Sequence, residues 1–152
     1  MSGINDAVLL LNLIKGGAVA RYNKCFGSSG VANSGSETKL DIEDEWAYLC
    51  TYMANLQAKD VTMLRTGIHD WQGTLVAMAD PARTAEKCKS ILDAASVHGI
   101  KVVLVLGGFA DSNTSAQGAG LFDDKSALYA KFVRYAATVA DALKGYEALE
   151  LI

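Results

Sequence analysis

The chain has 152 residues, of which 51% are hydrophobic and 20% are charged, and it contains one proline. This composition is typical of a globular protein with a buried core and excludes disordered and collagen-like proteins. The net charge of −3 comes without any cluster of lysine and arginine, so the sequence predicts no nucleic-acid partner and no binding to anionic membranes.

The first apolar run covers residues 7–14. It lacks the basic segment and the small-residue cleavage site of a signal peptide, and it is shorter than the roughly 20 apolar residues that span a bilayer. We therefore expect a cytoplasmic protein from the chain as given, or a secreted one if a leader was removed. The first strand is expected within residues 17–22, although residues 7–14 compete for that role and could instead form a hairpin or a helix.

Three later segments place apolar side chains on one face of a helix. An aspartate followed by proline is a strong helix start, and a glycine after the last turn is a strong helix end. The expected helices run from about Asp41 to Ala58, from Asp80-Pro81 to His98-Gly99, and from Asp123-Asp124 to Lys144-Gly145.

A short apolar or β-branched run follows each of these helices and predicts a strand. The runs are Val61–Leu64, Val102–Leu106 and Ala148–Ile152. Helices between strands impose parallel pairing with right-handed crossovers, and the second run is apolar throughout, as in parallel strands that are covered on both faces. The sequence thus predicts a single α/β domain over residues 1–152, built as a β-α-β-α-β-α-β parallel repeat. A small doubly wound domain with another strand order fits the same pattern.

Long polar connections leave the carboxyl ends of the expected strands, whereas the helix-to-strand connections are short. The long ones are Gly27–Thr38, Thr66–Asp80 and Gly107–Asp123. In parallel α/β proteins the carboxyl end of the sheet is the usual place for a ligand. These connections therefore predict a binding face, with solvated loops as the alternative.

Several stretches of the sequence resemble a known protein family. The stretch 85–104, AEKCKSILDAASVHGIKVVL, is similar to the second helix and third strand of clan A glycoside hydrolases, the cellulase and mannanase type of (β/α)₈ barrel. Residues 121–152 are similar to the third helix and fourth strand, and weaker matches lie at 22–27 and 60–71. The resemblance implies the amino-terminal half of a TIM barrel, a (β/α)₄-type fragment that ends at the fourth strand of a retaining O-glycosyl hydrolase.

The catalytic residues of that family fall outside the resemblance. Its fourth strand leads into Asn-Glu-Pro, whose glutamate is the general acid, and its seventh strand carries a second glutamate as nucleophile. The chain reaches Ile152 where that motif would begin, so we expect no catalytic residue and no activity of the chain alone. The family's second-strand arginine aligns with Thr62, with Arg65 as an imperfect substitute. Gly107 and Gly108 stand where the third strand often ends in histidine.

Candidates for carbohydrate binding remain at the strand ends. In the sequence His69-Asp70-Trp71, an imidazole beside a carboxylate could orient a sugar hydroxyl, and the indole could stack on the sugar ring. A cluster of polar loop residues is the alternative, and core packing is the alternative for each aromatic residue. The candidate substrate-binding residues are Tyr22, His69, Asp70, Trp71, Phe109 and Asn113, with Phe26 as a further aromatic.

Other reactive side chains have structural interpretations. The three cysteines, Cys25, Cys50 and Cys88, lack CxxC spacing and are expected as buried free thiols, with a disulfide or metal role for Cys25 as the alternative. His98 is expected to complement a helix C-terminus. Glu147 and Glu150 should face opposite sides of a regular strand. The sequence has no metal-ligand cluster and no phosphate-binding loop, so we expect no cofactor.

Two classes of function follow. The first is a carbohydrate-active barrel of which this chain is one part, and whether that part is itself an enzyme stays open. The second is a non-catalytic half-barrel, natural or engineered, that closes by pairing with a second copy as a homodimer or with a complementary half-barrel chain. Four strands of a barrel leave two unpaired edges and an uncovered apolar face, which favours such an oligomer.

Overall fold

Four parallel strands form the sheet, in the order β1-β2-β3-β4. The computed structural model describes residues 2–6, 9–15, 45–69, 71–108 and 123–151. The strands are β1 (Gly3–Asp6), β2 (Met63–Gly67), β3 (Lys101–Val105) and β4 (Leu149–Leu151), and the helices are α1 (Leu9–Lys15), α3 (Glu45–Gln57), α4 (Trp71–Ala79), α5 (Pro81–Val97) and α7 (Ala127–Ala142).

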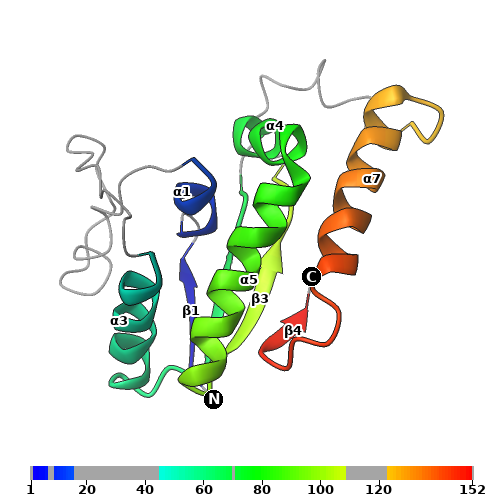
Figure 1. Ribbon diagram of the computed structural model, residues 1–152. Coiled ribbons are helices and arrows are strands. Elements are labelled where there is room, and N and C mark those ends of the chain that lie inside the picture. Colours follow the sequence, from blue (N-terminus) through cyan, green and yellow to red (C-terminus); the bar gives the residue numbers. More distant parts are fainter. Residues whose placement is uncertain (1, 7–8, 16–44, 70, 109–122, 152) are drawn as a thin grey trace.

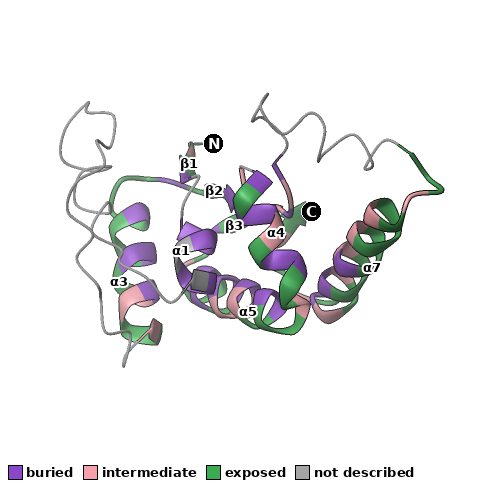
Figure 2. Ribbon diagram, turned by 90° about the horizontal axis from the view of Figure 1, so that it is seen from above, coloured by how far each residue is buried: buried purple, intermediate pink, exposed green. Residues whose placement is uncertain are grey.

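The long helices α3, α5 and α7 lie on one side of the sheet (Figure 2). The short helices α1 and α4 lie near the carboxyl ends of the strands (Figure 1). The strand side chains that point toward the helices are buried, such as Leu64 of β2 and Val102 and Leu104 of β3. They form the core together with residues of α5 such as Ile91 and Leu92. No helix of the described residues covers the opposite face, which is called the open face below.

Local signals set the ends of α5 as the sequence predicts. The side chain of Asp80 accepts a hydrogen bond from the backbone N–H of Arg83 at 3.0 Å, and Pro81 is the first helical residue. His98 is the C-terminal cap, and Gly99 follows with a φ of 65°. Glycine adopts that conformation without the steric cost that a Cβ would bring.

Helix α7 begins slightly later than its aspartates indicate. Ser126 is the N-cap, and its hydroxyl accepts a hydrogen bond from the N–H of Tyr129. Asp123 instead stabilises the preceding turn, because its side chain accepts from the N–H of Lys125 at 3.0 Å. At the other end Gly145 has a φ of 87°, in agreement with the predicted glycine stop.

The first two strands differ from the prediction. The strand beside β2 is Gly3–Asp6, and the segment 17–22, expected to hold a strand, lies outside the described residues. The run at 7–14 overlaps α1, which is the helical alternative. Strand β2 begins at Met63 rather than Val61, because the chain first turns back from α3 through Asp60, whose φ is 57°.

Helix α4 occupies part of the segment 66–80, which the sequence predicts as a loop. Its buried residues include Trp71, Gly73, Thr74, Ala77 and Met78, so the helix has no wide polar face. A helix that is apolar on most sides lacks the periodicity by which amphipathic helices are recognised.

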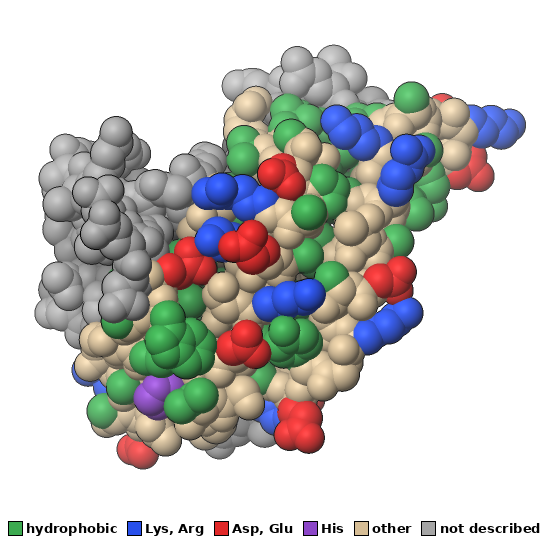
Figure 3. Space-filling model, in the orientation of Figure 1, with side chains coloured by type: hydrophobic (Ala, Val, Ile, Leu, Met, Phe, Trp, Pro, Cys, Tyr) green, Lys and Arg blue, Asp and Glu red, His purple; other side chains and the backbone are tan. Residues whose placement is uncertain are grey.

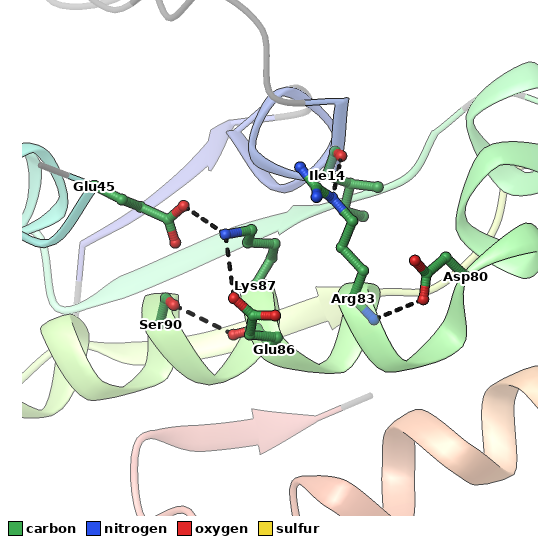
Figure 4. Close-up of polar contacts among 7 residues, drawn as sticks. All are labelled: Ile14, Glu45, Asp80, Arg83, Glu86, Lys87 and Ser90. Atoms are coloured by element: carbon green, nitrogen blue, oxygen red, sulfur yellow. Dashed lines mark hydrogen bonds and ion pairs between the residues drawn. The ribbon is translucent and has the colours of Figure 1, made fainter. Parts of the chain in front are cut away.

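Polar side chains of α5 hold α1 and α3 in place (Figure 4). Arg83 donates from Nε to the carbonyl oxygen of Ile14 at 2.8 Å, at the C-terminal end of α1. Lys87 forms ion pairs with Glu45 of α3 at 2.8 Å and with Glu86 at 3.4 Å. Among the described residues of the helix-covered face, cationic and acidic side chains are interspersed (Figure 3), so these residues offer no patch of one charge to a ligand.

Two cysteines lie within the described residues, and both are free thiols. Cys88 is buried in the core as expected, and Cys50 is half-buried. Burial raises the pKa of the Cys88 thiol to about 12, so this thiol is uncharged at neutral pH and behaves as a small apolar side chain. Cys25 lies outside the described residues.

Candidate functional site

The carboxyl end of β1 is closed by a buried carboxylate. Asp6 accepts a hydrogen bond from the N–H of Leu9 at 3.0 Å and another from the hydroxyl of Tyr52 at 2.8 Å. It thereby caps α1 and joins β1 to α3. Next to it on β2, the buried Thr66 accepts from the N–H of Leu10 at 3.4 Å. These contacts hold α1 over the ends of β1 and β2. The side chains of Asp6 and Thr66 therefore have a structural role here.

The carboxyl ends of β2 and β3 approach each other closely at Gly67. A Cβ at this position would lie 2.2 Å from the carbonyl oxygen and 2.6 Å from the nitrogen of Val105. The φ of Gly67 is 155°. The next residue, Ile68, donates its N–H to the same carbonyl of Val105 at 2.8 Å. Glycine is therefore required for this approach.

Thr74 of α4 anchors the chain as it leaves β3. Its hydroxyl donates to the carbonyl oxygen of Gly108 at 3.2 Å and accepts from the N–H of Gly108 at 3.0 Å. Nearby, the hydroxyl of Tyr135 donates to the carbonyl of Leu106 at 2.9 Å, and burial raises the pKa of that phenol. The start of the predicted 107–123 connection is thus held by side chains from α4 and α7.

The structure describes two of the six predicted substrate-binding residues. His69 is half-buried between β2 and α4. Trp71 is the first residue of α4 and is 2% exposed, so its ring packs in the interior and leaves little surface on which a sugar could stack. The other four, Tyr22, Asp70, Phe109 and Asn113, lie outside the described residues, as does Phe26.

The open face carries a row of side chains whose proximity was not predicted from the sequence. Asn5, Arg65, Val103 and Leu151 are register partners across the four strands, and they are called the central row below. Arg65 donates from Nη1 to Oδ1 of Asn5 at 3.2 Å. The exposed Arg65 is in β2, whereas Thr62, which the resemblance aligns with the family arginine, precedes the strand.

An irregular register sets the position of the last acidic residues. Val102 pairs with Leu149, but the next residue, Val103, pairs with Leu151. Glu150 is therefore an extra residue, as in a β-bulge, where two residues oppose one on the neighbouring strand. The regular alternation expected of Glu147 and Glu150 does not apply, since Glu147 precedes β4 and the strand itself is bulged.

The opposite, amino end of the sheet has structural contacts and a shallow hollow. Nδ1 of His98 lies 3.3 Å from Oε1 of Gln57, and the His98 N–H bonds to carbonyls of the last turn of α5, in agreement with its predicted structural role. A hollow of about 370 Å³ is lined by Asp93, Ser96, Lys144, Gly145, Tyr146, Glu147 and Ala148. Its residues come from the short helix-to-strand connections, away from the predicted binding edge.

No protein-family model matches the chain, and comparisons with curated proteins and with solved structures also give no match. Within the described ranges, no group of three or more histidine, cysteine, aspartate or glutamate side chains is arranged to hold a metal ion. None of the described helices is long and apolar enough to cross a membrane.

Proposed function

We propose that the chain is the carbohydrate-binding first half of a (β/α)₈ barrel of the glycoside hydrolase type, and that it binds a sugar chain at the carboxyl ends of its strands. The observation that carries this proposal is the sheet itself: all strands are parallel and in sequential order, and the long helices lie on one face. Repeated strand-helix units in this arrangement build the wall of a barrel, whose ligands bind at the carboxyl end.

One polar group at that end suits a sugar. The half-buried imidazole of His69 follows β2, whereas Asn5 and Arg65 lie in the middle of their strands on the open face. We assign Trp71 a supporting role behind His69, because its ring is buried.

Binding without hydrolysis is the expected activity of the chain. A retaining mechanism needs two carboxyl groups about 5 Å apart, one protonated and one ionised. Within the described residues, the central row and its bulge offer a single carboxylate, that of Glu150. A general acid alone raises the reaction rate by only about 10²–10⁴-fold.

The two histidines of the chain provide a direct test. His69 lies at the carboxyl end of the sheet and His98 at the amino end, so their ring signals in a proton NMR spectrum report on the two ends separately. Titration with cellohexaose or mannohexaose should shift the His69 signal and leave the His98 signal in place, and chromatography should detect no shorter product. The signals are assigned with His69→Gln and His98→Gln. A shift confined to His98, or no shift of either signal at millimolar sugar, would refute the proposed site.

The open face favours a second function, assembly. Parallel sheets occur almost always with both faces covered, yet Leu151 is 63% exposed and Val103 and Val105 are only half-buried. We propose that a further set of strands covers this face, supplied by a second copy of the chain or by a complementary half-barrel chain. Such closure leaves the carboxyl-end ligand site accessible.

A further inference from the structure

The open face carries two cations, at neighbouring levels of the sheet. Arg65 belongs to the central row, and Lys101 lies one level nearer the amino end, where it is the register partner of Met63. Both cationic side chains are exposed. Their chain neighbours Leu64 and Val102 are buried beneath the helices. Because successive side chains of a strand point to opposite faces, Arg65 and Lys101 point to the open face.

The remaining open-face positions of β1, β2 and β3 carry no charge. They are Gly3, Asn5, Met63, Gly67, Val103 and Val105. Two residues of the four strands have a carboxylate, namely Asp6 and Glu150. Asp6 points to the helices, where it accepts the hydrogen bond from Tyr52. The open face of one chain therefore has two cations and at most one carboxylate.

Neither cation is neutralised within the described part of the chain. Arg65 donates from Nη1 to the amide oxygen of Asn5 at 3.2 Å. Lys101 donates from Nζ to the backbone carbonyl oxygen of Glu147 at 2.6 Å. Both acceptors are neutral, and the ion pairs among the described residues involve α3, α5 and the end of α7 instead. Covering a guanidinium or an ammonium group without an opposite charge is costly, so whatever covers this face must bring carboxylates.

A second copy of the chain does not meet this requirement. Two copies that close around a twofold axis parallel to their strands place each side chain that points at the axis opposite its own symmetry mate. Arg65 would then face Arg65, and Lys101 would face Lys101. The two copies together would bring twice two cations and at most twice one carboxylate. The excess of like charge opposes such an association.

We propose that the open face binds a different chain, a complementary half-barrel whose inward side chains include carboxylates at the levels of Arg65 and Lys101. The proposal rests on the assembly function above and selects between its two partners. The half-buried apolar side chains of Met63, Val103 and Val105 supply surface for the partner to cover. The two cations then decide which chain is accepted, because they favour an acidic partner and disfavour a second copy.

An acidic version of the chain itself is the probe. The double variant Arg65→Glu, Lys101→Glu presents carboxylates at the same two levels, so in a mixed pair each wild-type cation faces a carboxylate. Native mass spectrometry distinguishes mixed pairs from pairs of one chain when the variant is labelled with nitrogen-15. In an equimolar mixture, the mixed pair should form at least about tenfold more tightly than either chain pairs with itself.

Two further variants separate the open face from net charge and from folding. The double variant Lys131→Glu, Arg134→Glu changes two exposed cations of α7 and should pair with the wild type no better than the wild type pairs with itself. A mixed pair as tight as that of the probe would refute the site. The neutral double variant Arg65→Gln, Lys101→Gln should pair with itself more tightly than the wild type does, because the opposed like charges are gone.

The outcomes distinguish the partner from the assembly. If the wild type pairs with itself as tightly as with the probe, the selection of an acidic partner is refuted and the assembly stands. If no combination associates at about 100 micromolar, the neutral variant included, both the partner and the assembly function are overturned. The histidine titration with sugar needs no partner chain, so the carbohydrate proposal is judged separately.

Discussion

Replacement of Gly67 by alanine should destabilise the fold severely. The added Cβ would lie 2.2 Å from the oxygen, 2.6 Å from the nitrogen and 2.7 Å from the Cβ of Val105. These atoms belong to the neighbouring strand, so the two strands must separate. Overpacking costs about 1–3 kcal/mol and a strained backbone conformation about as much again. We therefore expect Gly67→Ala to lower the free energy of unfolding by about 2–6 kcal/mol, measured by urea denaturation.

Two other glycines supply matched controls. A Cβ on Gly3 of β1 would lie 3.7 Å from its nearest neighbour, the carbonyl oxygen of Met63, and a Cβ on Gly99 would meet nothing within 4 Å. Gly3→Ala should thus change the free energy little, and Gly99→Ala should cost about 1 kcal/mol, from its positive φ alone. If Gly67→Ala unfolds at the same urea concentration as Gly3→Ala, the close approach of β2 and β3 is wrong.

Two further predictions concern buried polar groups. Thr74→Val should lower the free energy of unfolding by about 1–3 kcal/mol, because both backbone groups of Gly108 lose their partner. Thr74→Ser keeps the hydroxyl and should retain most of the stability. Equal losses of stability in the two variants would contradict the role of the hydroxyl. Between pH 9.0 and about 12 the Cys88 thiol ionises in the unfolded chain but not in the folded one, so stability should fall as pH rises through this window. Cys88→Ala should flatten that slope in urea denaturation, and an unchanged slope would show that other groups cause it.

The sequence predicts best those elements whose ends have local causes. Asp80 and Pro81 start α5 by their own chemistry, and Gly99 and Gly145 end turns because glycine tolerates a positive φ. These signals act within a few residues, so no knowledge of the fold is needed. The parallel strand-helix order follows from them, because each helix must return the chain to the same end of the sheet.

The features that were missed depend on distant contacts. β1 has one aliphatic side chain, Ile4, and is a strand because Met63 and Leu64 lie beside it. The placement of Arg65 on the open face depends on a register that begins at Met63, two residues later than the apolar run indicates. The bulge at Glu150 appears only in the pairing of β4 with β3. The candidate central row could not be derived from spacing, since each of its residues comes from a different strand.

The bond between Arg83 and Ile14 has a consequence for how the chain is made. It joins residues 69 positions apart, and β1 meets its partner strand 60 positions further along the chain. At synthesis rates of about 5–20 residues per second, β1 therefore waits roughly 3–12 s for β2 to emerge. Strands β3 and β4 emerge later still, after α5 and α7. Until β2 has emerged, buried side chains of α1 such as Leu10 and Leu13 lack the sheet against which they pack and are open to chaperones.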